Sequence, residues 1–271
     1  MNKTRIVLGI EYDGSGYSGW QWQTKYRSVQ LVLQQALSKI ANHPVTVICA
    51  GRTDTGVHAL EQVIHFDTTC QRELHTWTLG GNSYLPDDVR ITWAQQAVGD
   101  FHARYSAIAR FYRYIILNRS IKSALLRKQV TWCHAPLDAD VMHEAAQHLI
   151  GQHDFSSFRA QGCQSVSPCR AMHFIDVYRE GEKVIIDISA NAFLHHMVRN
   201  IAGVLMAIGS GKEPIDWTRH LLEVKDRKLG GITASPDGLY LGAVYYPEHY
   251  GIAKHPVFNK LPENTQRHVW T

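Results

Sequence analysis

The pattern of apolar and polar positions predicts alternating strands and helices through the first hundred residues. Apolar side chains alternate with small or polar ones at 5–12, which indicates a strand. Ser28 precedes apolar residues spaced three and four apart up to Ile40, as in an amphipathic helix with a serine N-cap. Further strands are predicted at 44–50, 62–69 and 88–97, with a short helix at 73–80. This order is typical of an α+β fold.

The rest of the chain repeats this alternation. The predicted strands lie at 109–117, 172–180, 183–190 and 238–246, with a hairpin turn at 180–182, and the predicted helices lie at 138–150, 194–208 and 217–224. We therefore predict two related α/β lobes, residues 1–102 and 103–271, with a central cleft. No linker rich in Pro, Gly or Ser separates them, so we expect the lobes to share one mixed, mostly antiparallel sheet.

Charge is unevenly distributed along the 271 residues. The chain holds 28 Lys and Arg and 24 Asp and Glu, yet no acid occurs between Asp13 and Asp54 or between Asp100 and Asp138. Eleven of the 28 cations lie in these two stretches. The same stretches contain the aromatic residues Tyr17, Trp20, Trp22, Tyr26, Tyr105, Phe111, Tyr112 and Tyr114. Because cations follow phosphates and flat rings stack on unpaired bases, the pattern favours RNA or single-stranded nucleic acid as the partner.

Cysteine usage and hydropathy indicate the compartment. The five cysteines are odd in number and contain no CxxC pair, which is typical of a reducing environment and argues against a zinc site or a disulfide framework. The apolar run near the N-terminus is interrupted by Glu11 and Asp13, and no segment approaches membrane-spanning length. We therefore predict a cytoplasmic protein with no membrane partner.

Three motifs suggest cofactor or metal sites and fail on inspection. The GxGxxG match at Gly14–Gly19 lacks both a helix at its last glycine and an acid about twenty residues later, so it does not predict a dinucleotide site. In "HEAAQH", 143–148, the second histidine falls at i+5 and not at i+4. The adjacent His195 and His196 cannot share one face of the predicted helix. We therefore predict no metal and no organic cofactor.

The stretch "AGRTDTGVHAL", Ala50–Leu60, is unusual for a turn after a buried strand. Such a turn requires glycine and a polar cap, but not an arginine together with a carboxylate. Residues two apart on an extended chain point the same way, so Arg52 and Asp54 can share one face. Asp54 is the candidate for chemistry.

This stretch resembles the active-site motif of the TruA-type tRNA pseudouridine synthases. The likeness continues in order over about 240 residues, through "EYDGSGYSGWQWQ" (11–23), "NSYLPDDVRI" (82–91), "FHARYSAIARFYRYII" (101–116), "HDFSSFRA" (153–160), "NAFLHHMVRNIAG" (191–203) and "GLYLGAVYYP" (238–247). The resemblance implies the pseudouridine synthase fold, with RNA in the cleft. It also implies isomerisation of uridine to pseudouridine at positions 38, 39 and 40 of the tRNA anticodon stem-loop. Members are homodimers that need no metal or cofactor, and each tRNA spans both subunits.

The resemblance also assigns roles to individual residues. Asp54 corresponds to the nucleophilic aspartate, and Arg199 to the arginine that ion-pairs with it. Tyr112 corresponds to the tyrosine that stacks on the target uracil, and Arg52 to the arginine that displaces this base from the RNA stack. RNA contact is implied for two segments, which consist of Phe101, His102, Ala103, Arg104 and Tyr105, and of Gly162, Cys163, Gln164, Ser165 and Val166.

Several questions stay open at this stage. A carboxylate could attack ribose C1′ or uracil C6, or it could abstract a proton from the sugar. A non-catalytic RNA-binding protein and an aspartate-based hydrolase are the competing functions. Three positions depart from the family pattern: Thr55 replaces alanine, Trp22 replaces a basic residue and Glu61 replaces glycine.

Overall fold

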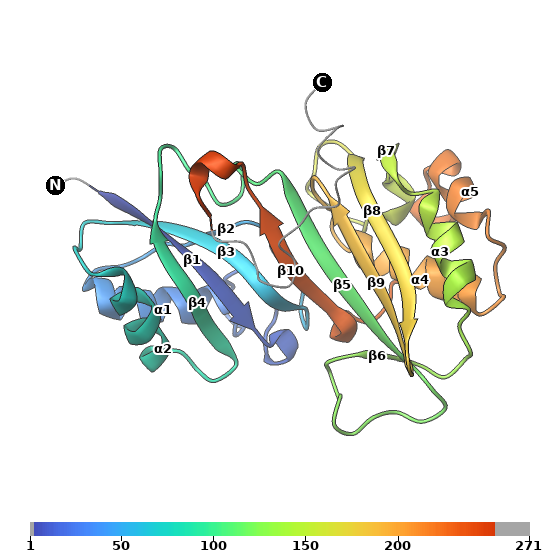
Figure 1. Cartoon of the computed structure of the whole chain (residues 1–271), viewed down its shortest axis with the longest axis horizontal. Helices are drawn as coiled ribbons and strands as arrows, with labels where there is room; N and C mark the ends of the chain where they lie inside the picture. Colours follow the sequence, from blue (N-terminus) through green and yellow to red (C-terminus); the bar gives the residue numbers. More distant parts are fainter. Residues whose placement is uncertain (1–2, 253–271) are drawn as a thin grey trace. The chain divides into compact units, whose positions relative to one another are not determined.

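The computed structural model describes residues 3–252 (Figure 1). These residues form two compact units, one made of 3–108 with 240–252 and the other of 109–239. The first division falls six residues after the boundary expected at 102. The last strand belongs to the first unit, although the expected division placed it in the second lobe. Hydrophobic periodicity identifies a strand but not the strand with which it pairs.

The sheet of the first unit has the order β4-β1-β3-β10. Strands β1 (Thr4–Tyr12), β3 (His58–Thr68) and β4 (Val89–Gln96) pair antiparallel, whereas β10 (Leu239–Tyr245) runs parallel to β3. Tyr240 lies opposite His58, and Figure 1 shows β10 beside the start of β3. The short strand β2 (Ile48–Cys49) pairs with the other end of β3.

Helices cover one face of this sheet. In α1 (Val29–Ala41), the Ser28 hydroxyl accepts the N–H of Leu31 and so caps the helix as predicted. A π-helical turn (Thr76–Gly80) leads directly into α2 (Gly81–Tyr84). Trp77 of this turn packs edge-on against Phe66 of β3, with ring centroids 5.1 Å apart. Phe66 and its even-numbered neighbours therefore form the core under the helices, while the odd-numbered residues of β3 occupy the opposite face.

Within the second unit, the strands lie in the order β5-β9-β8-β7. Strands β5 (Ala109–Asn118), β9 (Lys183–Ala190), β8 (Cys169–Glu180) and β7 (Gly151–Asp154) pair antiparallel, and β6 (Thr131–Cys133) lies parallel to β5. Its helices are α3 (Ala139–Gln147), α4 (Met197–Gly209) and α5 (Trp217–Val224). The β8–β9 hairpin turns at Gly181, whose φ of 57° suits glycine.

Short 3₁₀ turns connect these elements, at Gly14–Gly16, Ser156–Phe158, Arg227–Leu229, Pro236–Gly238 and Glu248–Tyr250. Within the described residues, no helix has both the length and the hydropathy to cross a membrane.

The α+β class predicted from the sequence is confirmed, as are most elements. Two expectations need correction. The predicted strand at 44–50 pairs with β3 at Ile48 and Cys49, whereas the buried Val45 and Val47 donate their N–H groups to side chains of α1. The predicted helix at 194–208 begins only at Met197, because His196 adopts a left-handed conformation with φ of 62°.

Candidate active site

The glycine-rich loop after β1 holds the loop that carries Asp54. The Trp20 N–H donates to the carbonyl oxygen of Thr53 at 3.0 Å, and the Gly56 N–H donates to that of Tyr17 at 3.4 Å. The hydroxyls of Tyr12 and Thr53 are 2.7 Å apart in a buried hydrogen bond. Backbone and side-chain contacts therefore fix both sides of Asp54.

Two glycines make this close approach possible. A Cβ atom at Gly14 would lie 1.9 Å from the Val57 carbonyl oxygen. At Gly19, where φ is +83°, a Cβ atom would lie 2.8 Å from the Thr53 carbonyl oxygen. The motif that resembles a dinucleotide site thus shapes the Asp54 loop. The sequence shows the glycine spacing of this motif, but it does not show that the motif packs against the Asp54 loop.

Asp54 lies on a tight turn, in which the Val57 N–H donates to the Asp54 carbonyl oxygen at 3.1 Å. Thr53 is buried, whereas the Asp54 side chain is half-buried and Arg52 is exposed. Burial raises the pKa of the nearby Cys49 thiol to about 12, and the charges of Arg52 and Arg104 partly oppose this rise. These two cations therefore lie near one buried thiol on the first unit.

His58 follows this turn as the first residue of β3 and is only 3% exposed. Its Nδ1 accepts the Gly14 N–H at 3.2 Å and lies 3.1 Å from Asp13 Oδ1. The imidazole stacks on Tyr240, with ring centroids 4.7 Å apart and planes inclined by 19°. The sequence predicts a structural role for His58, in capping or bridging the loop, but it does not identify the partners, because Gly14 and Tyr240 are distant along the chain.

The segment predicted to bind RNA at Phe101–Tyr105 is divided by burial. Phe101 and Ala103 are fully buried, and the Ala103 N–H donates to His65 Nδ1 at 3.0 Å. Tyr105 is 76% exposed and stacks on His102 at a centroid distance of 4.4 Å, while the Arg104 guanidinium lies 5.5 Å from the Tyr105 ring. Arg104 and Tyr105 are thus the two exposed side chains of this segment.

In the second unit, Arg199 is held by the loop before β10. Its Nε donates to the Ala234 carbonyl oxygen at 2.8 Å, and the Ala234 N–H donates back to the Arg199 carbonyl oxygen at 3.1 Å. The buried Asn200 secures the same loop, since its Oδ1 accepts hydrogen bonds from Thr233 at 2.6 Å and from Arg227 at 3.0 Å. These contacts anchor the first turn of α4 to the loop before β10.

Tyr112 lies on β5 opposite Ile188 and is 8% exposed. Phe193 meets its ring edge-on, with centroids 5.0 Å apart and planes inclined by 81°. The contact fixes the orientation of the phenol ring.

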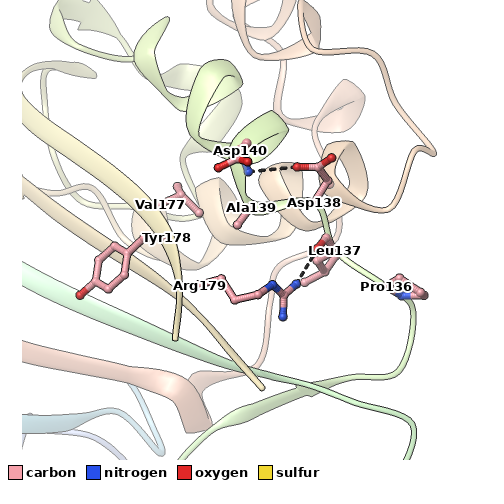
Figure 2. A pocket seen from close by; sticks show the side chains of 9 residues that line it. Pro136, Leu137, Asp138, Ala139, Asp140, Val177, Tyr178 and Arg179 are labelled. Carbon is pink, nitrogen blue, oxygen red and sulfur yellow. Dashed lines mark hydrogen bonds between the residues drawn. The ribbon is translucent and has the colours of Figure 1, made fainter. Parts of the chain in front are cut away.

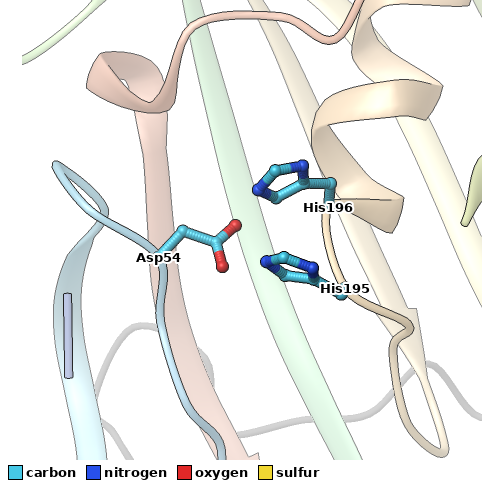
Figure 3. A group of neighbouring side chains, drawn as sticks. All are labelled: Asp54, His195 and His196. Atoms are coloured by element: carbon cyan, nitrogen blue, oxygen red, sulfur yellow. The ribbon is translucent and has the colours of Figure 1, made fainter. Parts of the chain in front are cut away.

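The rings of His195 and His196 lie side by side, with centroids 4.0 Å apart (Figure 3). The sequence argument that these side chains cannot share a face is wrong, because both residues precede α4 and do not belong to it.

The second segment predicted to bind RNA, Gly162–Val166, forms an exposed loop braced by two arginines. Arg159 donates to the carbonyl oxygens of Cys163 at 2.6 Å and Ser165 at 2.8 Å, and Arg170 donates to Ser165 Oγ at 2.6 Å. Burial raises the pKa of the Cys163 thiol, but hydrogen bonds from Ser165, His195 and Arg159 outweigh it and leave this pKa below its ordinary value. Val166 at the tip is 100% exposed.

A hollow of about 650 Å³ lies elsewhere on the second unit (Figure 2). It is lined by Pro136, Leu137, Asp138, Ala139, Asp140, Val177, Tyr178, Arg179 and Gly209. Asp138 accepts the N–H groups of Asp140 and Val141 as the cap of α3. Arg179 donates to the Leu137 carbonyl oxygen at 2.6 Å. These polar groups serve the fold, so the hollow is not the candidate site.

Similarity to known proteins decides the family. The sequence pattern of the family described as tRNA pseudouridine synthase matches residues 9–106 and 145–247. This chain belongs to that family. A protein named tRNA pseudouridine synthase A from Methylococcus capsulatus is 60% identical to it over 264 residues, which cover 97% of each chain. Proteins of the same name from Nitrosococcus oceani and Vibrio campbellii are 58% and 54% identical. The two alignments cover 92% and 96% of this chain, and 96% and 99% of the respective relatives.

Membership of the tRNA pseudouridine synthase family identifies the chain as an isomerase. One solved structure, described as the crystal structure of a Cbf5–Nop10–Gar1 complex, aligns with 74% of this chain and 54% of its own length. Its sequence identity of 11% and TM-score of 0.30 are too low to bear on the site.

Proposed function

We propose that this pseudouridine synthase isomerises uridine at positions 38, 39 and 40 of the tRNA anticodon stem-loop, with Asp54 as nucleophile and the target base flipped from its stack. The observation that carries this proposal is the fixed Asp54 loop. Thr53 and Gly56, on either side of Asp54, are hydrogen-bonded to the glycine-rich loop, while the carboxylate itself is half-buried. A nucleophile requires such a fixed and accessible position.

The other site residues supply charge and a stacking surface in this proposal. Arg52 is exposed, as a residue that displaces a base from duplex RNA must be. Arg199 acts as the counter-ion of Asp54, and the braced loop at Ala234 limits its freedom. The ring of Tyr112, steadied by Phe193, stacks on the detached uracil.

The reaction balances without any additional reagent. The bond between ribose C1′ and uracil N1 breaks, the ring turns, and a bond forms between C1′ and C5. C5 then releases its proton and N1 takes one up. Attack at C1′, attack at C6 and abstraction of a sugar proton all remain compatible with an aspartate at position 54. No redox cofactor is required, because the isomerisation involves no net oxidation or reduction.

The proposed RNA surface combines the exposed members of the two predicted segments. Arg104 offers charge for phosphates and Tyr105 offers a ring for stacking. The Gly162–Val166 loop offers exposed backbone and side chains, and Val166 is its most exposed residue. We further propose that the enzyme is a cytoplasmic homodimer in which each tRNA contacts both subunits.

The test is tritium release from an unmodified tRNA transcript labelled at uracil C5. Rejoining the ring through C5 releases the hydrogen of that carbon to water. We expect release by the wild type and by Asp87→Asn, which makes the same chemical change at an exposed carboxylate that pairs with Arg90 on the surface. We expect no release by Asp54→Asn, with tRNA binding retained in a filter assay.

Two results would contradict the proposal. Release by Asp54→Asn at the wild-type rate would remove Asp54 from the chemistry. Absence of release by the wild type from several tRNAs with uridine at the three positions, despite binding, would favour a non-catalytic RNA-binding protein.

A further inference from the structure

We propose that His58 is a positioning residue, which fixes the Asp54 loop by accepting the Gly14 N–H at Nδ1. This inference rests on the proposed role of Asp54. Because the imidazole is 3% exposed, His58 acts through its neighbours and not on RNA.

The hydrogen bond from the Gly14 N–H depends on where the imidazole carries its proton. An imidazole nitrogen accepts a hydrogen bond only when it carries no proton. The 3.2 Å contact from the Gly14 N–H therefore requires neutral His58 with its proton on Nε2. If His58 gained a second proton, Nδ1 would become a donor and its partner would be Asp13 Oδ1, 3.1 Å away.

Asp13 is already arranged as that alternative partner. Its carboxylate accepts the Ser15 N–H at 2.9 Å. Nδ1 of His58 thus lies within reach of both the Gly14 N–H and the Asp13 carboxylate. With no proton on Nδ1, the ring accepts the N–H.

Gly14 and Val57 connect His58 to Asp54. Gly14 lies between the imidazole and the next turn of chain, since its N–H meets His58 while its α-carbon packs against the Val57 carbonyl oxygen. Val57 in turn closes the Asp54 turn through its own N–H at 3.1 Å. Displacement of Gly14 therefore moves Val57, and Val57 moves the backbone of Asp54.

Tyr240 prevents the ring from rotating out of this arrangement. It stacks nearly parallel on the imidazole, and the strand pair β3–β10 places it there. A leucine of similar volume would fill the same space without an acceptor for Gly14. The geometry thus accounts for a histidine at this buried position.

The decisive comparison uses two amides of different reach. In His58→Asn, Oδ1 occupies the place of Nδ1 and can accept the Gly14 N–H; in His58→Gln, the amide lies one bond farther out. We expect His58→Asn to keep kcat within about threefold of the wild type. Since misplacement of a reacting group by an ångström costs on the order of a hundredfold, we expect His58→Gln to lose kcat by 10- to 100-fold with KM for tRNA unchanged.

Hydrogen exchange gives a readout that does not depend on activity. We expect the Gly14 amide to exchange faster in unliganded His58→Gln than in the wild type or His58→Asn, with all three proteins fully folded by circular dichroism. If His58→Gln does not fold, Tyr240→Leu is used in its place. This variant keeps the imidazole and removes its stacking partner, and we again expect faster exchange of the Gly14 amide.

Equal kcat for the two amide variants, or unchanged exchange at Gly14, would overturn the inference. Its failure is distinguishable from that of the proposed function. If Asp54→Asn still releases tritium, Asp54 is not the nucleophile, but the exchange experiment still reports whether His58 holds Gly14.

Discussion

Trp93 reaches Glu61 across an intervening strand. The indole Nε1 on β4 donates to Glu61 Oε1 on β3 at 3.1 Å, and Gly9 of β1 lies between them. A Cβ atom at Gly9 would be 2.1 Å from that indole nitrogen, so glycine is required for the contact. Glu61 is 3% exposed, and burial raises its pKa to about 7 despite the opposing hydrogen bond from Trp93.

Glu61 is expected to make the protein less stable as pH rises. Below pH 4.5 the folded and unfolded chains both keep the proton, so no penalty arises. Between about pH 4.5 and 7 the unfolded chain releases the Glu61 proton first, and the free energy of unfolding falls by up to about 3 kcal/mol. We predict that Glu61→Gln, which keeps an acceptor for Trp93, is more stable than the wild type at pH 8 and equal to it near pH 4. Urea titrations across this range would measure the difference, and parallel curves would exclude the effect.

His65 is expected to act in the opposite direction. Burial, together with the charge of Arg5, lowers its pKa from 6.5 to about 4, so the folded chain resists its protonation. Above pH 6.5 His65 takes nothing from the free energy of unfolding. This free energy falls as pH decreases toward 4, by about 2 kcal/mol after allowance for solvent screening. His65→Asn retains an acceptor for the Ala103 N–H and should remove this acid-side slope. A slope as steep in the variant as in the wild type would assign the loss to other groups.

Gly19 tests how closely the glycine-rich loop must approach Asp54. Gly19→Ala meets two penalties, a φ of +83° and a contact of 2.8 Å with the Thr53 carbonyl oxygen, and should cost about 2 kcal/mol or more. Gly99→Ala is the matched control, since its φ is +60° but no described atom lies within 4 Å of the added carbon. We expect both variants to lose stability and only Gly19→Ala to lose turnover as well. Equal turnover in the two would show that the close approach does not matter for catalysis.

Tyr105 tests the proposed RNA surface. Loss of a ring that stacks on a base costs about 1–3 kcal/mol, so Tyr105→Ala should weaken tRNA binding by roughly 5- to 150-fold. Tyr105→Phe should bind like the wild type, because stacking does not need the hydroxyl. Tyr84→Ala removes another exposed ring, which lies against Lys39, and should leave the Kd unchanged. Equal weakening by both alanine variants would point to a non-specific effect.

The sequence predicts most elements of the fold, because hydrophobic periodicity reports which face of each element is buried. It does not predict their partners. Val45 and Val47 have the alternation of a strand, yet this pattern records only burial, and the ladder there is short. His196 stops α4 from beginning earlier through a left-handed backbone conformation that the apolar pattern of the helix does not reveal.

The candidate site was predictable to a similar extent. Asp54 and Arg52 are recognisable from their spacing and from the family motif, since both depend on adjacent residues. For His58 the sequence predicts a structural role in the loop but not the partners, because its hydrogen bond and its stacking contact come from Gly14 and Tyr240. Long-range contacts of this kind are determined by the sheet order, which a single sequence does not contain.

The discontinuity of the first unit also affects how the protein is made. Its residues up to 108 leave the ribosome first, but Tyr240 and the strand that pairs with the start of β3 are synthesised only after the whole second unit. Until then His58 lacks its stacking ring, and one edge of β3 is open to pairing with other chains. A nascent or truncated chain that ends before β10 therefore has the Asp54 motif without the strand that completes its support. Competence for the proposed reaction therefore requires that β10 has been synthesised and has paired with β3.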